Sequence, residues 1–137
     1  MLAYFVLFSL FPSVLTFRQQ MVGVRGRLTC GNLPLPNTTV KLWDNNMIGT
    51  DKQLADTKTD QNGNFELSGG LGSIFGMDVH FKIYHDCEDG IVPCQRKVDL
   101  RVPSSYVSRS SRVEKWFEAG TMNMAFKYPN EERSCIN

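Results

Sequence analysis

Residues 60–63, Asp-Gln-Asn-Gly, are the feature that most constrains how this chain can fold. Asn and Gly adopt positive φ angles at little cost, so Asn62-Gly63 favours a tight reversal of the backbone. Beyond the turn, Phe65 and Leu67 alternate with Glu66, which is typical of a strand with one buried face. The sequence therefore predicts a β-hairpin in the middle of the chain.

The same period of two recurs along most of the chain. It predicts strands over residues 22–30, 39–44, 54–60, 64–68, 79–84 and 97–102, and a bent strand over 113–126 that breaks at Gly120. No internal repeat and no long pattern of period 3.6 is present. About seven short antiparallel strands separated by turns indicate an all-β fold, a β-sandwich or an open barrel.

The segments between these strands lack a strand pattern. Residues 31–36 are expected to stay unpaired because their two prolines have no N–H donor. The glycine-rich residues 69–76 are expected to be a flexible connection, and residues 103–112 a loop or a single helical turn. In the last strand, the residues expected in the core are Phe117, Met122, Met124 and Phe126.

Residues 1–16 are expected to be a signal peptide. They contain the apolar, uncharged run Leu2–Phe11, and the first charged side chain is Arg18. This run is shorter than the roughly 20 residues that span a bilayer, but it has the length of the apolar part of a secretory signal. A buried N-terminal strand is the alternative. Residues 17–137 are then one secreted, extracellular domain, in which the sequon beginning at Asn37 is a candidate glycosylation site.

Four cysteines, Cys30, Cys87, Cys94 and Cys135, all lie in the expected mature chain. An even number in a small secreted chain predicts two disulfides. A zinc site would require closely spaced pairs, and the two nearest cysteines here have six residues between them. The sequence allows three pairings and leaves the choice among them open.

The charge of the chain is informative only by region, because the net charge is +1. Residues 44–66 hold five acidic and two basic side chains, whereas residues 95–116 hold six basic and two acidic ones. A Lys or Arg near an anionic membrane contributes about 1 kcal/mol, and a Trp can sit at headgroup depth. The candidate lipid-binding residues are therefore Arg109, Arg112, Lys115 and Trp116, and the competing interpretation is a solvated loop beside a packed Trp.

No pattern for catalysis, metal binding or nucleic acid is found. The two histidines, His80 and His85, are five residues apart on one expected strand, so they should point to opposite faces. Aromatic residues in a pattern suited to base stacking are also absent. We expect no catalytic residue, no metal site, no cofactor and no nucleic-acid partner.

A set of ordered motifs covering nearly the whole mature chain resembles the nematode transthyretin-like protein family. These motifs are Val24–Cys30, Val40–Asp44, Thr57–Gly69, Ile83–Cys87, Cys94–Lys97, Val102–Val107, Phe117–Met124 and Glu132–Asn137. The resemblance implies a secreted, transthyretin-type β-sandwich with all four cysteines at one end. It also implies that Cys30 pairs with Cys87 and that Cys94 pairs with Cys135.

The wider fold includes one enzyme branch, the hydroxyisourate hydrolases, whose motifs this chain lacks. Those enzymes use a His on the first strand, an Arg after the mid-chain turn and a C-terminal Tyr-Arg-Gly-Ser. Here the first strand has no His, Asn64 follows the turn, and the chain ends in Ser134–Asn137. That activity is therefore rejected, and a binding protein is expected.

One kind of member of the resembled family is a bridging factor, which binds phosphatidylserine on dying or damaged cells and links it to an engulfment receptor. The expected partners are then an anionic phospholipid headgroup at a membrane surface and a cell-surface receptor. The alternative is an extracellular carrier of a small hydrophobic ligand, gated by residues 69–76 with Leu71, Ile74 and Phe75. The receptor and the oligomeric state stay open.

Overall fold

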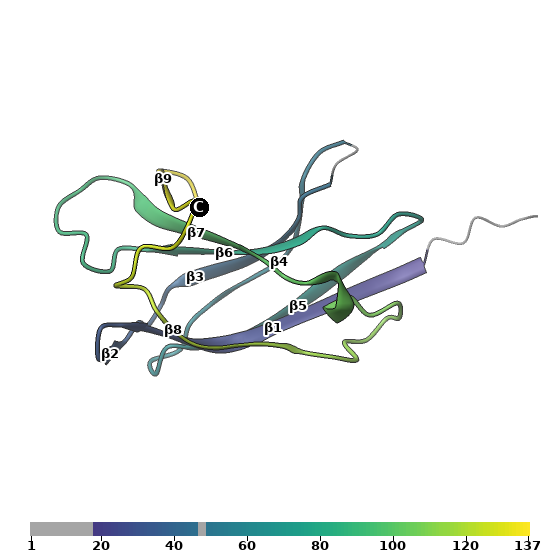
Figure 1. The fold of residues 1–137 in the computed structure, drawn as a ribbon, viewed down its shortest axis with the longest axis horizontal. Helices are drawn as coiled ribbons and strands as arrows, with labels where there is room; N and C mark the ends of the chain where they lie inside the picture. The colour runs from purple at the N-terminus through teal and green to yellow at the C-terminus, as the bar shows by residue number, and fades with distance from the viewer. Residues whose placement is uncertain (1–17, 47–48) are drawn as a thin grey trace, which may run out of the picture.

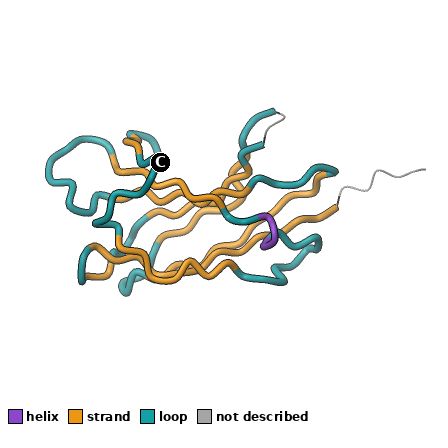
Figure 2. The backbone as a smooth tube through the Cα atoms, in the orientation of Figure 1, coloured by secondary structure: helices purple, strands orange, loops and turns teal. Residues whose placement is uncertain are grey.

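The protein folds into two facing β-sheets (Figure 1), and the computed structural model describes residues 18–46 and 49–137. The predicted signal peptide, residues 1–16, lies outside the described residues, as do Met47 and Ile48. The strands are β1 (Arg18–Cys30), β2 (Leu33–Pro34), β3 (Thr39–Asp44), β4 (Lys52–Lys58), β5 (Asn64–Ser73), β6 (Val79–His85), β7 (Gln95–Arg101), β8 (Phe117–Asn123) and β9 (Glu132–Ser134). A short 3₁₀ turn, η1 (Ser104–Tyr106), follows β7 (Figure 2). The predicted all-β fold is confirmed.

The first sheet has the order β2-β1-β5, with β8 on the other side of β1, and the second has the order β4-β3-β6-β7-β9. All but one of the strand pairs in these sheets are antiparallel. β8 runs parallel to β1, with Val24 opposite Phe117 and Thr29 opposite Asn123. Alternation of side chains does not reveal strand direction, so this pairing was not predicted.

The predicted turn forms at Asp60–Gly63, but the predicted hairpin is wrong, because the flanking strands β4 and β5 belong to different sheets and do not pair with each other. The Gly63 N–H donates to the Asp60 carbonyl over 3.0 Å, and the Asp60 carboxylate accepts from the N–H groups of Asn62 and Asn64, each at 2.9 Å. Gly63 has φ 80°. Its carbonyl accepts from the N–H of Leu28 at 2.8 Å, so the turn is also tied to β1.

Two segments expected to be irregular are strands. β5 runs on to Ser73 because β1 begins at Arg18 and pairs with it as far as that residue. At Gly70 a Cβ would collide with the carbonyl oxygen of Gln20, so the glycine permits a close backbone approach here. Leu33 and Pro34 pair with the end of β1 as a short edge strand, where the missing N–H of proline is tolerated.

The core lies between the sheets and is filled by the side chains that alternation predicted to face inward. Its largest fully buried apolar members are Phe81, Leu28, Leu42, Ile83, Met124, Val22, Val24, Val40, Val79, Val98 and Val102. The prediction for Phe126 is wrong: it is 67% exposed, because β8 ends at Asn123 and the chain turns there, with the Phe126 N–H donating to the Asn123 carbonyl. In the described part of the chain, no helix is long and apolar enough to cross a membrane.

Candidate functional site

The four residues predicted to bind lipid lie in the segment that joins η1 to β8. This segment is fixed to β1 by two backbone hydrogen bonds between Met21 and Ser108, at 2.9 and 2.7 Å. The Ser108 hydroxyl also accepts from the N–H of Glu114 at 2.9 Å. The segment lies at the end of the sandwich where β5 turns into β6 (Figure 1). That end is called the tip end below.

Trp116 lies against the sheet surface. A Cβ placed on Gly23 of β1 would come within 2.6 Å of its ring, so the ring packs directly against the strand. The guanidinium of Arg25 stands 5.1 Å from the centre of the ring on which it packs. Trp116 therefore packs on the outer face of the first sheet and is not positioned as a free membrane anchor.

The three basic residues of the predicted set are separated in their contacts. The Lys115 ammonium lies 4.5 Å from the centre of the Tyr106 ring. The backbone of Arg112 is bonded to the Ser110 hydroxyl, and its side chain is exposed. Arg109 lines a pocket to which the other three predicted residues do not contribute.

The pocket at Arg109 has a volume of about 240 Å³, and it is called the tip pocket. It is lined by Gln20, Ser73, Ile74, Phe75, Gly76 and Arg109. Within residues 18–46 and 49–137, Arg109 has no ion pair and no side-chain hydrogen bond. The pocket therefore combines one unpaired guanidinium with a polar floor and two apolar walls.

The loop that carries the apolar walls is held in place by a buried amide. Gln20 is only 5% exposed, and its Nε2 donates to the Phe75 carbonyl at 2.8 Å and to the Ser73 carbonyl at 3.4 Å. The Phe75 N–H donates to the Ser73 hydroxyl at 3.0 Å. Ile74 and Phe75 are nevertheless 47% and 55% exposed. Their backbone is fixed while their side chains project into solvent.

Sequence reasoning assigned Ile74 and Phe75 to a ligand gate and missed their place beside Arg109. The expected flexible connection over residues 69–76 is shorter than predicted, because residues 69–73 belong to β5 and residues 74–78 connect it to β6. One signal was available: two large apolar residues stand in a stretch with no strand or helix period.

Both disulfides lie at the opposite end of the sandwich and have the pairing that the family resemblance implies. Cys30 at the end of β1 is bonded to Cys87, and Cys94 before β7 is bonded to Cys135. Cys87 and Cys94 flank the loop between β6 and β7. One end of that loop is thus bonded to the end of β1, and the other end is bonded to the C-terminal tail.

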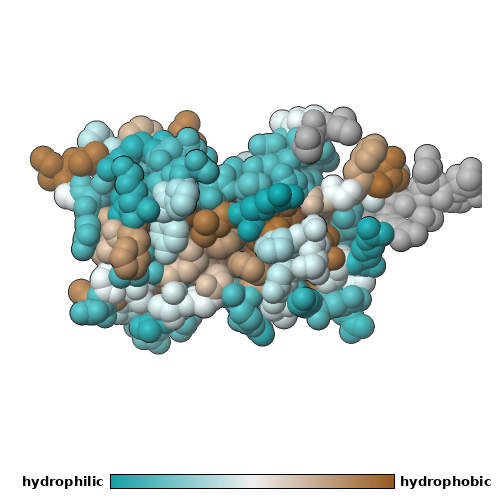
Figure 3. Space-filling view, in the orientation of Figure 1, coloured by the Kyte–Doolittle hydropathy of each residue, from teal (hydrophilic) through white to brown (hydrophobic). Residues whose placement is uncertain are grey.

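This loop presents apolar side chains to solvent. Asp89 is buried and forms an ion pair with Arg133, whose guanidinium holds the pKa of that carboxyl below its usual value. Ile91 is fully exposed and Val92 is half exposed. Neighbouring turns at this end add the exposed side chains of Leu33, Phe126 and Ile136. Figure 3 shows apolar surface at both ends of the long axis.

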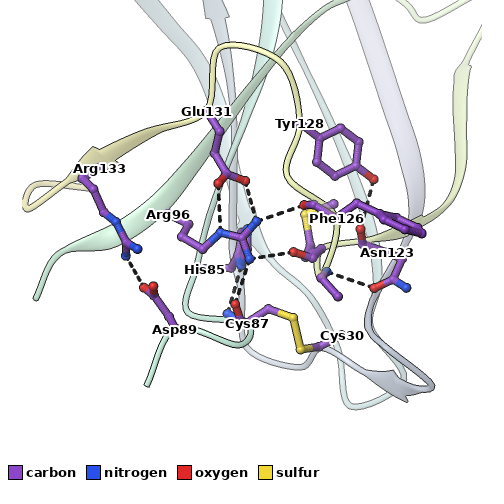
Figure 4. A network of polar contacts seen from close by, with 12 residues as sticks. Cys30, His85, Cys87, Asp89, Arg96, Asn123, Phe126, Tyr128, Glu131 and Arg133 are labelled. Atoms are coloured by element: carbon purple, nitrogen blue, oxygen red, sulfur yellow. Dashed lines mark hydrogen bonds and ion pairs between the residues drawn. A yellow bond between two sulfur atoms is a disulfide. The ribbon is translucent and has the colours of Figure 1, made fainter. Parts of the chain in front are cut away.

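Arg96 links the segments at the disulfide end (Figure 4). Its guanidinium donates to the carbonyls of Cys87, Met124 and Phe126 at 2.8, 2.9 and 2.9 Å. It also binds both carboxylate oxygens of Glu131, at 3.0 and 2.7 Å. Arg96 is 8% exposed, so all of these contacts are made away from bulk water.

His85 lies beside this cluster and is 2% exposed. Its Nδ1 accepts the N–H of Cys87 at 3.0 Å, and its Nε2 is buried with no hydrogen-bond partner among the described residues. Burial, and then the positive charge of Arg96, lower the pKa of His85 from 6.5 to about 4. The neutral ring is therefore the form that the fold accommodates.

His80 lies near the other end of β6 and, unlike His85, is in contact with carboxylates near the surface. Its Nδ1 is 2.7 Å from the Asp99 carboxylate, and its Nε2 is 3.5 Å from Asp78, which also binds Arg101 at 3.0 Å. These are surface ion pairs on the outer face of the second sheet. Within the described ranges, no group of three His, Cys, Asp or Glu side chains could hold a metal ion.

Asn37, the candidate glycosylation residue, is exposed in the turn before β3 and has φ 52°. The next residue, Thr38, is buried, and Thr39 begins β3. The Asn37 residue is thus accessible, while the two residues that complete its sequon lead directly into the sheet.

Comparison with known proteins gives consistent matches. The profile of the Transthyretin-like family matches residues 25–103. The chain is 40% identical over 119 residues to Transthyretin-like protein 5 of Caenorhabditis elegans, a match that covers 86% of each chain. It is 41% identical over 119 residues to Transthyretin-like protein 33 of the same animal, covering 86% of this chain and 83% of the relative. Transthyretin-like protein 2 is 38% identical over 126 residues, or 88% and 85% of the two chains.

Proposed function

Because the chain belongs to the transthyretin-like family, we propose that it is a secreted binding protein without catalytic activity. Its ligand is an anionic phospholipid headgroup at a membrane surface, phosphatidylserine on dying or damaged cells. Its second partner is a receptor on the phagocyte, so the protein acts as a bridge. Extracellular location is supported by the two disulfides, which persist in oxidising compartments.

The observation that carries the lipid proposal is the unpaired Arg109 in the tip pocket. The phosphatidylserine headgroup offers a phosphate and a carboxylate, and a guanidinium binds either group through paired N–H donors. Arg112 and Lys115 on the same segment add positive charge near the membrane, at about 1 kcal/mol each. None of the described residues that line the pocket is acidic.

Bridging requires two surfaces that can be occupied together, and the two ends of the sandwich offer them. The tip pocket lies at one end, and the apolar loop between β6 and β7 lies at the other (Figure 1). The disulfides of Cys87 and Cys94 hold both ends of that loop in place, so the loop loses little conformational entropy when it binds a partner. The exposed Ile91 and Val92 are the side chains that we assign to the receptor.

Flotation with lipid vesicles tests the lipid half of this proposal. The protein should float with phosphatidylcholine vesicles that contain phosphatidylserine and stay at the bottom with pure phosphatidylcholine. Arg109→Ala should reduce recovery more than Arg112→Ala or Lys115→Ala, because only Arg109 lines the pocket. Lys127→Ala removes an exposed cation near the disulfide end and serves as the matched control. Equal recovery on both vesicle types would end the lipid proposal.

A further inference from the structure

We propose that the protein docks end-on to an anionic bilayer by inserting Ile74 and Phe75 into the outer leaflet. This inference rests on the proposed lipid function and adds the apolar contact and the orientation of the molecule. In this arrangement Arg109 binds the headgroup, and Ile74 and Phe75 enter the hydrocarbon beneath it.

The loop at the tip is held rigidly, and this is the first support for insertion. Gln20 is buried and bonds the carbonyls of both Ser73 and Phe75, and the Ser73 hydroxyl accepts the Phe75 N–H. The loop continues directly from β5, which pairs with β1 as far as Arg18. Two large apolar side chains are thus held on a fixed backbone and remain about half exposed.

The second step is the position of the charges. Arg109 shares the tip pocket with Ile74 and Phe75, so a guanidinium stands beside the apolar pair. Glu114, the acidic residue of the neighbouring segment, is exposed and is outnumbered there by the exposed Arg109, Arg112 and Lys115. Asp78, just beyond the loop, is paired with Arg101 at 3.0 Å and with His80 at 3.5 Å. A basic rim beside an apolar tip complements an anionic leaflet, where headgroups lie above hydrocarbon.

The third step is the shape of the molecule. The tip lies at one end of the long axis, and the strands β1 and β5 lead into it (Figure 1). Insertion of the tip therefore sets this axis steeply to the membrane. The disulfide end, with Ile91 and Val92, then points away from the bilayer and is open to a second partner.

The test places an environment-sensitive fluorophore at each end of the molecule. The native cysteines in the described chain are all in disulfides, so Phe75→Cys provides one thiol for labelling with a nitrobenzoxadiazole dye. Ile91→Cys is the matched control, an exposed apolar position at the other end. Both labelled proteins are mixed with phosphatidylcholine vesicles that contain one-fifth phosphatidylserine, with and without nitroxide-labelled lipid.

The dye at position 75 should shift to the blue and be quenched by nitroxide lipid, while the dye at position 91 should change in neither way. Unlabelled Ile74→Ser/Phe75→Ser should lose about tenfold in vesicle affinity because apolar burial is removed. Its thermal unfolding should stay close to that of the parent, since both side chains are exposed.

The outcomes separate the inference from the function on which it rests. Vesicle binding without a response at position 75 overturns the insertion and leaves lipid binding in place. Full vesicle affinity of Ile74→Ser/Phe75→Ser also overturns it, and would assign the loop to a protein partner. Absence of any binding to phosphatidylserine vesicles removes both proposals.

Discussion

The buried His85 should make the stability of this protein fall when the pH drops from neutral toward 4. Its pKa is about 4 in the folded protein, against 6.5 for an ordinary histidine. The unfolded chain therefore binds more protons between these two values, so the free energy of unfolding rises with pH in this window. The stabilisation that comes from keeping His85 neutral is complete above pH 6.5. Below that pH it decreases by up to about 1.4 kcal/mol per pH unit. The total loss by pH 4 is about 3 kcal/mol.

Urea unfolding between pH 4.5 and 7.5 measures this slope. His85→Asn keeps an oxygen that can accept the Cys87 N–H in place of Nδ1, but it cannot titrate, so its slope should be nearly flat. His80→Asn, at the other histidine, is the matched control and should keep the parent slope. Working above pH 4.5 avoids the range in which Asp89, whose pKa is lowered by Arg133, loses its contribution. A parent slope that survives in His85→Asn and disappears in His80→Asn would refute the assignment.

Three further predictions concern the disulfide end and the sequon. Arg96→Met should lower the free energy of unfolding by about 3–5 kcal/mol, because Glu131 is left as a buried, unpaired charge; a loss under about 1 kcal/mol in a urea titration would contradict this. Cys30→Ala/Cys87→Ala should cost about 4 kcal/mol by thermal or urea unfolding, since the bond joins residues 57 positions apart; an unchanged midpoint would argue that the bond does not restrict the unfolded chain. Protein made through a secretory route should carry a glycan that Asn37→Gln removes, as read by intact mass, and equal masses after allowing for the substitution would show that Asn37 is unmodified.

The local strand pattern could be predicted because it depends on near neighbours in the chain. β3 has the predicted bounds, and the turn at Asp60–Gly63 forms as expected, although it joins the two sheets and does not close a hairpin. The alternation over residues 79–84 also predicts that Lys82 lies on the outer face of its sheet, but it does not predict that Lys82 is buried there. It is only 9% exposed, with its ammonium 4.9 Å from the centre of the Trp43 ring. Burial on an outer face depends on which side chains lie across it, and that is set by sheet order.

The candidate site could be predicted only in part. The basic segment was identified from its charge, but Trp116 turned out to pack against Gly23, and only Arg109 reaches the pocket. The residues that line the pocket with Arg109 come from β1, from the end of β5 and from the loop after it, which are distant from Arg109 in sequence. No pattern in the segment itself contains that information.

By itself, the sequence determined an all-β chain, the mid-chain turn, most strand positions and a pair of disulfides. These follow from backbone preferences and from apolar alternation, which act over a few residues. Only the tertiary structure decided that β8 runs parallel to β1, that Gln20 fixes a loop 55 residues away, and that Arg109 stands beside Ile74 and Phe75. Such contacts depend on the order and register of whole strands, which packing of the complete core selects.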